Sequence, residues 1–240
     1  MKPRLALAFL LPIAALSLAA CPNDSPIVPL PGPVAQLQRF QAAAEAGKTA
    51  EIADQAVNGD CLPGGSGSDA CPALLAIHGR ACLQQAQAEA GPDNACPGPT
   101  DTAKRYLECA ERDLTRAVTI GGLKPDAVGG VQQNRALALY CRATFLPVAQ
   151  GGPMVSAAEA ALREAPDTAA TNRLKAQAAL YFAARDAVSK AERCAAVQRA
   201  KASAETGLTR NPNPRETEAL QRLLADSARW GARVGCGSGA

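Results

Sequence analysis

The chain has 240 residues, of which 3% are aromatic and 20% are charged, and its formal net charge is only +3. A surface that binds nucleic acid needs a basic stripe, so near-neutrality argues against a nucleic-acid partner. β-Sandwiches and barrels favour β-branched and aromatic residues, whereas this chain is rich in alanine, which favours helices. We therefore expect an all-α protein.

Residues 1–20 have the three zones of a secretory signal. Lys2 and Arg4 give a positive start, residues 5–18 form an almost unbroken apolar run, and two small alanines follow. The apolar run is shorter than the roughly 20 residues that cross a bilayer core. We therefore expect a signal peptide that is cleaved, rather than a permanent membrane span.

The segment 18–21 (LAAC) resembles the lipobox of bacterial lipoproteins, in which a small residue precedes a cysteine. The resemblance implies that Cys21 receives a diacylglycerol and, after cleavage, an N-acyl chain, and each buried CH₂ group contributes roughly 0.8 kcal/mol to anchoring. Pro22 rather than Asp follows, which by enterobacterial sorting rules implies the periplasmic face of the outer membrane. The outer leaflet of the inner membrane is the other destination. An ordinary signal peptide, with Cys21 as a spare thiol, is the alternative to lipidation.

A proline-rich segment follows the lipidation site, because residues 22–33 hold five prolines in twelve residues. Such a segment favours an extended polyproline form that rises roughly 3.1 Å per residue. We therefore expect residues 21–33 to be a lipidated cysteine and a linker. The linker would lift a helical domain, residues 34–240, off the membrane surface.

Eight cysteines remain after Cys21, and an even number in an exported chain predicts a disulfide framework. They are Cys61, Cys71, Cys82, Cys96, Cys109, Cys141, Cys194 and Cys236. No pair is spaced C-x-x-C, which argues against a thioredoxin-like centre and a c-type cytochrome. The chain has one histidine and no clustered Cys/His spacing, which argues against zinc. We expect no metal and no cofactor.

The rest of the chain has the apolar period of amphipathic helices, with Gly and Pro clusters between the helical blocks. This pattern predicts helices over 34–46, 49–57, 72–90, 101–119, 131–147, 154–165, 168–187, 191–209 and 214–231. Asp101 and Asp167 are the expected caps of two of them.

Three segments are similar to one another: Leu75–Leu83 (LAIHGRACL), Leu137–Phe145 (LALYCRATF) and, more loosely, Ala178–Asp186 (AALYFAARD). Each opens a predicted hairpin. The second helices resemble the tetratricopeptide repeat in their small residues and closing prolines: Ala110, Leu114, Ala117, Met154, Ala158, Ala161, Pro166, Ala200, Ala204, Gly207 and Pro212. Gly79 occupies the family's close-packing glycine position. The resemblance covers roughly residues 71–213, with uneven spacing, and implies antiparallel hairpins stacked as a tetratricopeptide-like α-solenoid. A generic alanine-rich bundle is the alternative.

Hairpin geometry predicts how the eight cysteines pair. Cys82 and Cys109 lie equally far from the centre of the loop 91–100, so we expect them to face each other in the first hairpin. Cys61 and Cys71 bracket a glycine-rich loop, and the other four lie at helix ends that hairpins bring together. The predicted pairs are 61–71, 82–109, 96–141 and 194–236, each contributing about 2–4 kcal/mol to stability.

No catalytic group is expected. A nucleophile needs a base beside it, and His78 is the only histidine. His78 occupies the position that Tyr140 holds in the related segment, so we interpret it as a half-buried repeat position. An enzyme that uses carboxylates alone is the remaining enzymatic alternative.

Tetratricopeptide relatives bind peptides or proteins on the concave wall formed by the first helices of their hairpins. The resemblance therefore implies exposed partner-binding residues on those helices: Arg80, Gln84, Arg142, Tyr181 and Arg185. Arg and Tyr are enriched at binding hot spots, although an ordinary solvated surface is the alternative for all five. The expected function is a non-enzymatic, membrane-anchored scaffold for protein partners in the periplasm. A lipoprotein that captures a small ligand or a metal is the alternative.

Overall fold

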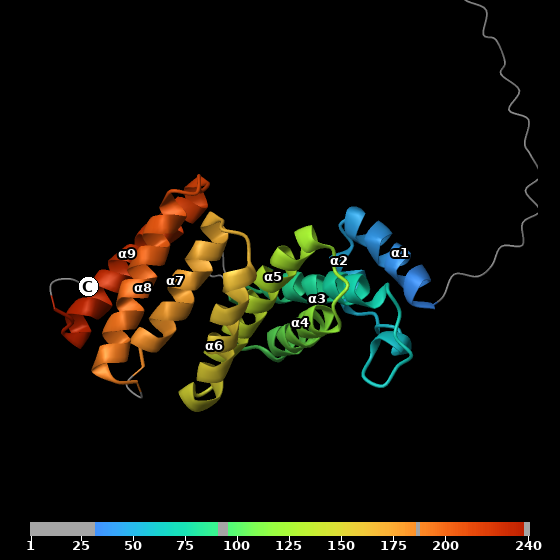
Figure 1. The fold of residues 1–240 in the computed structure, drawn as a ribbon, viewed down its shortest axis with the longest axis horizontal. Coiled ribbons are helices and arrows are strands. Elements are labelled where there is room, and N and C mark those ends of the chain that lie inside the picture. Colours follow the sequence, from blue (N-terminus) through green and yellow to red (C-terminus); the bar gives the residue numbers. More distant parts are fainter. Residues whose placement is uncertain (1–31, 91–95, 186–187, 238–240) are drawn as a thin grey trace, which may run out of the picture. The chain divides into compact units, whose positions relative to one another are not determined.

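We describe the protein from a computed structural model, in residues 32–90, 96–185 and 188–237 (Figure 1). These ranges belong to one compact unit, residues 31–240, and all their regular structure is helical. The elements are α1 (Gly32–Glu45), α2 (Thr49–Ala53), a 3₁₀ turn η1 (Gly59–Cys61), α3 (Cys71–Ala88), α4 (Asp101–Ile120), α5 (Pro125–Thr144), α6 (Val148–Glu164), α7 (Ala169–Ala183), α8 (Lys190–Leu208) and α9 (Pro214–Val234). The predicted all-α class is confirmed for the described residues.

Each predicted helix is present, and α1 begins two residues before its predicted start at residue 34. Helix α1 begins at Gly32, so the last two residues of the expected linker are helical. Pro33 is tolerated there because the first amide groups of a helix have no intrahelical partner that proline could remove. The rest of the linker, residues 21–31, and the signal, residues 1–20, lie outside the described residues.

Helices α5 and α6 both begin several residues earlier than predicted. The prediction placed each start after a pair of glycines, because such a pair usually marks a break, but both pairs lie inside the helices. Gly129 in α5 packs so closely that a Cβ there would lie 3.1 Å from Cδ of Pro166. A Cβ at Gly151 in α6 would lie 2.7 Å from the carbonyl oxygen of Ala143. Close packing between helices therefore outweighs the poor helix propensity of glycine at these positions.

Consecutive helices pack as hairpins. The largest interfaces join α3 with α4, α5 with α6 and α7 with α8, and α9 packs on α8. The facing residues are small: Ala110, Ala117 and Ala158 are completely buried. A Cβ at Gly79 in α3 would lie 2.8 Å from Cγ of Leu114 in α4. Small residues therefore let the helices of each hairpin approach closely.

Four disulfides join segments that are near neighbours along the chain. They are Cys61–Cys71, Cys82–Cys109, Cys96–Cys141 and Cys194–Cys236, with Cα–Cα distances of 5.1–6.0 Å, as is usual for the bond. The pairing predicted from hairpin geometry is confirmed. Cys82–Cys109 joins α3 to α4 at residues inside both helices, and Cys194–Cys236 closes the hairpin of α8 and α9.

The two predicted caps are wrong by one residue. Thr100 rather than Asp101 accepts the capping hydrogen bond at the start of α4, and Thr168 rather than Asp167 does so at α7. Helices α8 and α9 each begin with a reciprocal capping box. Local hydrogen bonding therefore fixes where these four helices start.

The close approach of α3 and α4 can be tested at Gly79. We expect Gly79→Ala to lower the free energy of unfolding by about 1–3 kcal/mol, because the new methyl group overpacks the interface with Leu114. Gly130→Ala is the matched control: this helical glycine has no atom within 4 Å of an added Cβ, so alanine should stabilise by about 0.5–1 kcal/mol. Urea unfolding without reductant measures both, and equal effects would contradict the packing.

Candidate functional site

A pocket of about 430 Å³ lies among α5, α7 and α9. We call it the aromatic pocket, because its walls include Tyr140, Tyr181 and Trp230, in a chain that has three tyrosines and one tryptophan. Gln177, Arg185 and Leu223 also line it. Scarce aromatic side chains from three helices thus gather at one place.

Helical spacing explains why these residues share the pocket. Gln177 and Tyr181 are four residues apart on α7, so they lie above one another on one face of the helix, and Arg185 follows just after the helix ends. Leu223 and Trp230 on α9 are seven residues apart, which also places them on one face. Each helix therefore presents a stripe to the pocket rather than an isolated side chain.

Two buried polar atoms at the aromatic pocket have no hydrogen-bond partner within the described part of the chain. They are the Tyr181 hydroxyl oxygen and the Gln177 Oε1. Tyr181 is only 6% exposed, so its predicted exposure is wrong. A buried polar group without a partner costs about 1–3 kcal/mol. The Tyr181 hydroxyl packs against Gly151 of α6, so it lies behind the wall of the pocket rather than open to it.

Cationic side chains cover two of the aromatic rings. The Arg185 guanidinium lies 4.6 Å from the centroid of the Tyr181 ring, and that of Arg233 lies 4.9 Å from the Trp230 ring. Such cation–π contacts hold the rings while leaving the remaining guanidinium donors available. The pocket therefore combines flat apolar surface with the positive charge of Arg185 and the negative charge of Asp226.

The structure separates the five residues predicted to bind a partner. It brings Tyr181 and Arg185 together in the aromatic pocket, whereas Arg80 and Gln84 line a different pocket of about 300 Å³ beside α2. Arg142 forms ion pairs with Glu108, at 3.2 Å, and with Glu111. Arg142 therefore joins α5 to α4 and contributes nothing to either pocket.

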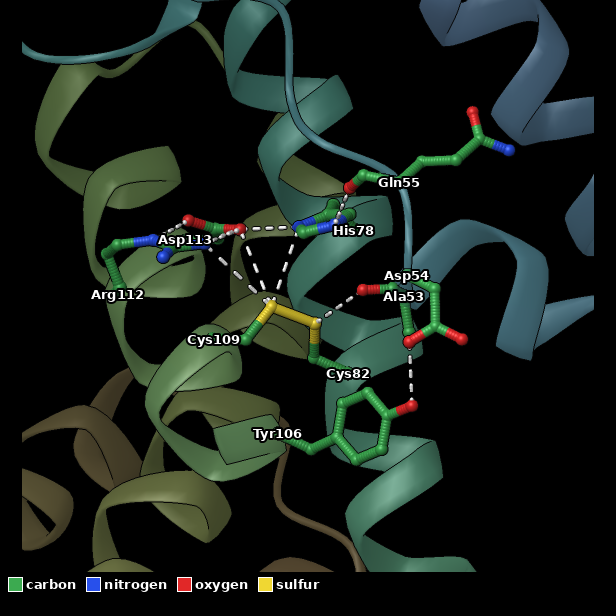
Figure 2. The surroundings of a disulfide bond; sticks show 9 residues. All are labelled: Ala53, Asp54, Gln55, His78, Cys82, Tyr106, Cys109, Arg112 and Asp113. Carbon is green, nitrogen blue, oxygen red and sulfur yellow. Dashed lines mark hydrogen bonds and ion pairs between the residues drawn. A yellow bond between two sulfur atoms is a disulfide. The ribbon is translucent and has the colours of Figure 1, made fainter. Parts of the chain in front are cut away.

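A second cluster of polar side chains surrounds the Cys82–Cys109 disulfide (Figure 2). His78 is 3% exposed and Asp113 is 1% exposed, and His78 Nδ1 lies 2.5 Å from Asp113 Oδ2. His78 Nε2 donates to the Gln55 carbonyl oxygen at 2.9 Å. His78 is thus buried and bonded on both ring nitrogens, which corrects the expectation of a half-buried repeat position.

Asp113 is held as a carboxylate by its neighbours. Burial alone would raise its pKa, but hydrogen bonds from His78 and Arg112 outweigh the burial and hold the pKa below its ordinary value. Arg112 Nε donates to Asp113 Oδ1 at 2.7 Å, and its Nη2 donates to Oδ2 at 3.1 Å. This bidentate pair fixes the carboxylate beside the disulfide.

Sequence reasoning missed three of the residues that matter at these sites. Trp230 could have been found from the sequence, because a lone tryptophan in an amphipathic helix marks a place where a large side chain is tolerated. Asp113 could also have been found, because it stands one helical turn after Cys109, just as Cys82 stands one turn after His78. Tyr140 became significant only once α7 and α9 were seen beside it. The predicted lipidation site, Cys21, lies outside the described residues.

Comparison with family models, with curated proteins and with solved structures gives no match for this chain. Among the described residues, no helix combines the length and the apolar character that a membrane crossing requires. What the protein does must therefore be argued from its own residues.

The environment of the aromatic pocket can be tested by alkaline titration. Loss of solvent contact, together with the nearby Tyr181 and against the opposing effect of Arg185, raises the pKa of Tyr140 to about 12. A phenol with a raised pKa stays neutral as the pH passes about 10, where a free tyrosine ionises. The difference between the phenolate absorbance of the wild type and that of Tyr140→Phe should therefore rise near pH 12. A midpoint near pH 10 would mean that Tyr140 is fully solvated.

Proposed function

We propose that this protein is a lipid-anchored scaffold of the bacterial envelope, whose aromatic pocket binds an extended segment of a partner protein. The observation that carries the proposal is the pocket itself, in which Tyr140, Tyr181 and Trp230 meet Arg185. Tyrosine, tryptophan and arginine are the residues most enriched at binding hot spots. In a chain with so few aromatic residues, their position at one surface is best explained by binding.

The polar side chains that line the pocket suit a peptide. An extended chain carries one donor and one acceptor per residue, which can bond to groups such as Gln177 and Arg185. Arg185 suits a carboxylate, from an acidic side chain or a chain terminus, because its planar guanidinium can pair with two oxygens. Trp230 offers a flat surface for an apolar side chain.

A tetratricopeptide-like arrangement of hairpins is part of the proposal. In support, α3 contacts α5, α5 contacts α7 and α7 contacts α9, in addition to the contacts within each hairpin. The aromatic pocket draws on the last three of these alternate helices, as a wall of first helices would. The small residues at repeat positions, including Ala110, Ala200 and Ala204, are completely buried. A generic bundle has no reason to alternate in this way.

Lipidation of Cys21 completes the proposal, with the outer membrane as the expected location. Tethering confines the scaffold to the membrane surface, where a second interaction with a nearby partner becomes effectively intramolecular. Even a modest affinity of the aromatic pocket would then suffice for a stable assembly.

The single tryptophan offers a direct binding assay. We expect the fluorescence of Trp230 to shift when a partner segment occupies the aromatic pocket, because that ring would lose water. Trp230→Ala lacks the reporter, so its binding is measured by titration calorimetry, and it should be weaker by about 30-fold, corresponding to a hot-spot loss of roughly 2 kcal/mol. Arg185→Ala should weaken binding to acidic segments in particular. Arg80→Ala, in the other pocket, is the matched control and should leave binding unchanged.

Site-specific photo-cross-linking in living cells identifies the partner. A cross-linker at Thr144, which lines the aromatic pocket, should capture an envelope protein, and Trp230→Ala should abolish the product. The control position is Lys201, which is exposed on α8. Equal products from both positions would argue against the pocket. A small molecule retained in native mass spectra would favour the alternative of a ligand-capture lipoprotein.

The anchor is tested separately. Wild-type protein should carry acyl groups on a mature amino terminus at Cys21 and fractionate with membranes, whereas Cys21→Ser should be released. Mass spectrometry of the amino-terminal peptide decides the point. An unacylated mature terminus would exclude the anchor, while leaving the aromatic pocket as a binding site.

A further inference from the structure

The buried cluster around Cys82–Cys109 offers four metal-binding side chains from two facing helices. His78 and Cys82 are one turn apart on α3, and Cys109 and Asp113 are one turn apart on α4. Figure 2 shows the His78 ring, the Asp113 carboxylate and the Cys109 sulfur facing one another. Within the described ranges, His78, Cys82 and Cys109 are the one set of three potential ligands whose atoms all lie within 4.8 Å of each other.

The distances from the Cys109 sulfur to its two neighbours suit a tetrahedral ion. Bond lengths of about 2.0–2.3 Å to zinc place neighbouring ligand atoms about 3.3–3.8 Å apart. Cys109 Sγ lies 3.6 Å from His78 Nδ1 and 3.8 Å from Asp113 Oδ2. His78 Nδ1 and Asp113 Oδ2 are 2.5 Å apart, so these two side chains must separate when an ion replaces the proton of their hydrogen bond. The Cys82 and Cys109 Cα atoms are 6.0 Å apart, so side-chain rotation can separate the sulfurs once their bond is broken.

The surroundings are those of a metal site. A metal-binding histidine usually donates its other ring N–H to a carbonyl or carboxylate, which fixes the ring. His78 Nε2 donates in this way to Gln55, and Phe40 stacks on the ring with centroids 5.9 Å apart. Arg112 would offset the extra negative charge of two thiolates and a carboxylate around a divalent ion. Asp113 also lines a surface pocket of about 390 Å³.

We propose that reduction of the Cys82–Cys109 disulfide turns this cluster into a zinc site with His78, Cys82, Cys109 and Asp113 as ligands. A dithiol reductant gives two electrons and two protons to the disulfide and is itself oxidised to a disulfide. Zn²⁺ then displaces both thiol protons and the proton between His78 and Asp113. A disulfide-forming oxidant that removes two electrons reverses the change and expels the metal. The hairpin of α3 and α4 is thus cross-linked in either redox state.

The spacing argument against zinc does not apply to this geometry. Sequence spacing reveals a metal site when paired ligands share one loop, as in C-x-x-C. Here each pair spans a helical turn, and the two pairs come together only through the packing of α3 on α4. The proposal is independent of the aromatic pocket, which lies on α5, α7 and α9.

The test is zinc binding by the purified full chain, oxidised and after anaerobic reduction, with the metal measured after gel filtration. We expect one tightly bound zinc ion in the reduced protein and none in the oxidised protein. Cobalt in place of zinc should give the thiolate charge-transfer absorption of a tetrahedral site. Bound zinc should protect Cys82 and Cys109 from alkylation while the other reduced cysteines react.

Paired variants separate a built site from general binding by reduced thiols. Cys82→Ser with Cys109→Ser should abolish tight binding, whereas Cys194→Ser with Cys236→Ser, which removes a different disulfide, should retain it. Arg112→Gln should weaken zinc affinity by about 10- to 100-fold, as loss of an outer partner does. Equal zinc binding by the two double variants would overturn the proposal. If reduction alone lowers the helical circular dichroism, zinc must restore it, and failure to do so would also overturn the proposal.

Discussion

The close approach of helices whose facing residues are alanine and glycine is the constraint on which the rest of this structure depends. Each buried alanine removes little apolar area from water, so the hydrophobic gain per residue is small. Close contact compensates through dispersion, since interiors are packed like crystals. It also leaves no space for an added methyl group, as the contact of Gly79 with Leu114 illustrates. Covalent cross-links suit such a core, because they restrict the unfolded chain without requiring larger side chains.

A core built in this way leaves large side chains for other places. Leucines such as Leu107 and Leu114 fill the hairpin of α3 and α4, while most aromatic rings lie at junctions between hairpins or beside polar groups. Phe40 stacks on His78, Tyr106 donates to Asp54 at 2.8 Å, and Tyr181 contacts Phe182 edge to face. The aromatic pocket belongs to the same pattern. Small residues define the hairpins, and aromatic residues mark where the hairpins meet one another or a partner.

This division explains what could be predicted from the sequence. Apolar period and turn residues locate the helices, and the short loop between α3 and α4 is enough to pair Cys82 with Cys109, because both depend on neighbours along the chain. The starts of α5 and α6 could not be predicted, since Gly129 and Gly151 are helical only because another helix presses against them. The burial of His78 and the joining of Tyr140 with Trp230 likewise depend on contacts between distant segments. Patterns within a short stretch of sequence thus predict the helices, whereas the two sites form only when helices that are distant in sequence pack together.

The cluster at Cys82–Cys109 and the aromatic pocket are connected through α4 and α5. Arg142 binds Glu108 and Glu111 across that interface, and Cys96–Cys141 fixes the end of α5 that carries Tyr140. A change of redox state can influence binding only if this interface differs in free energy between the two states. Because a tetrahedral zinc ion holds the two sulfurs farther apart than a disulfide does, α4 must adjust relative to α3 or the side chains must rotate. If rotation suffices, the two sites act independently. If α4 moves, Arg142 carries the movement to the wall of the pocket, so the affinity of the pocket with zinc bound reports which of the two occurs.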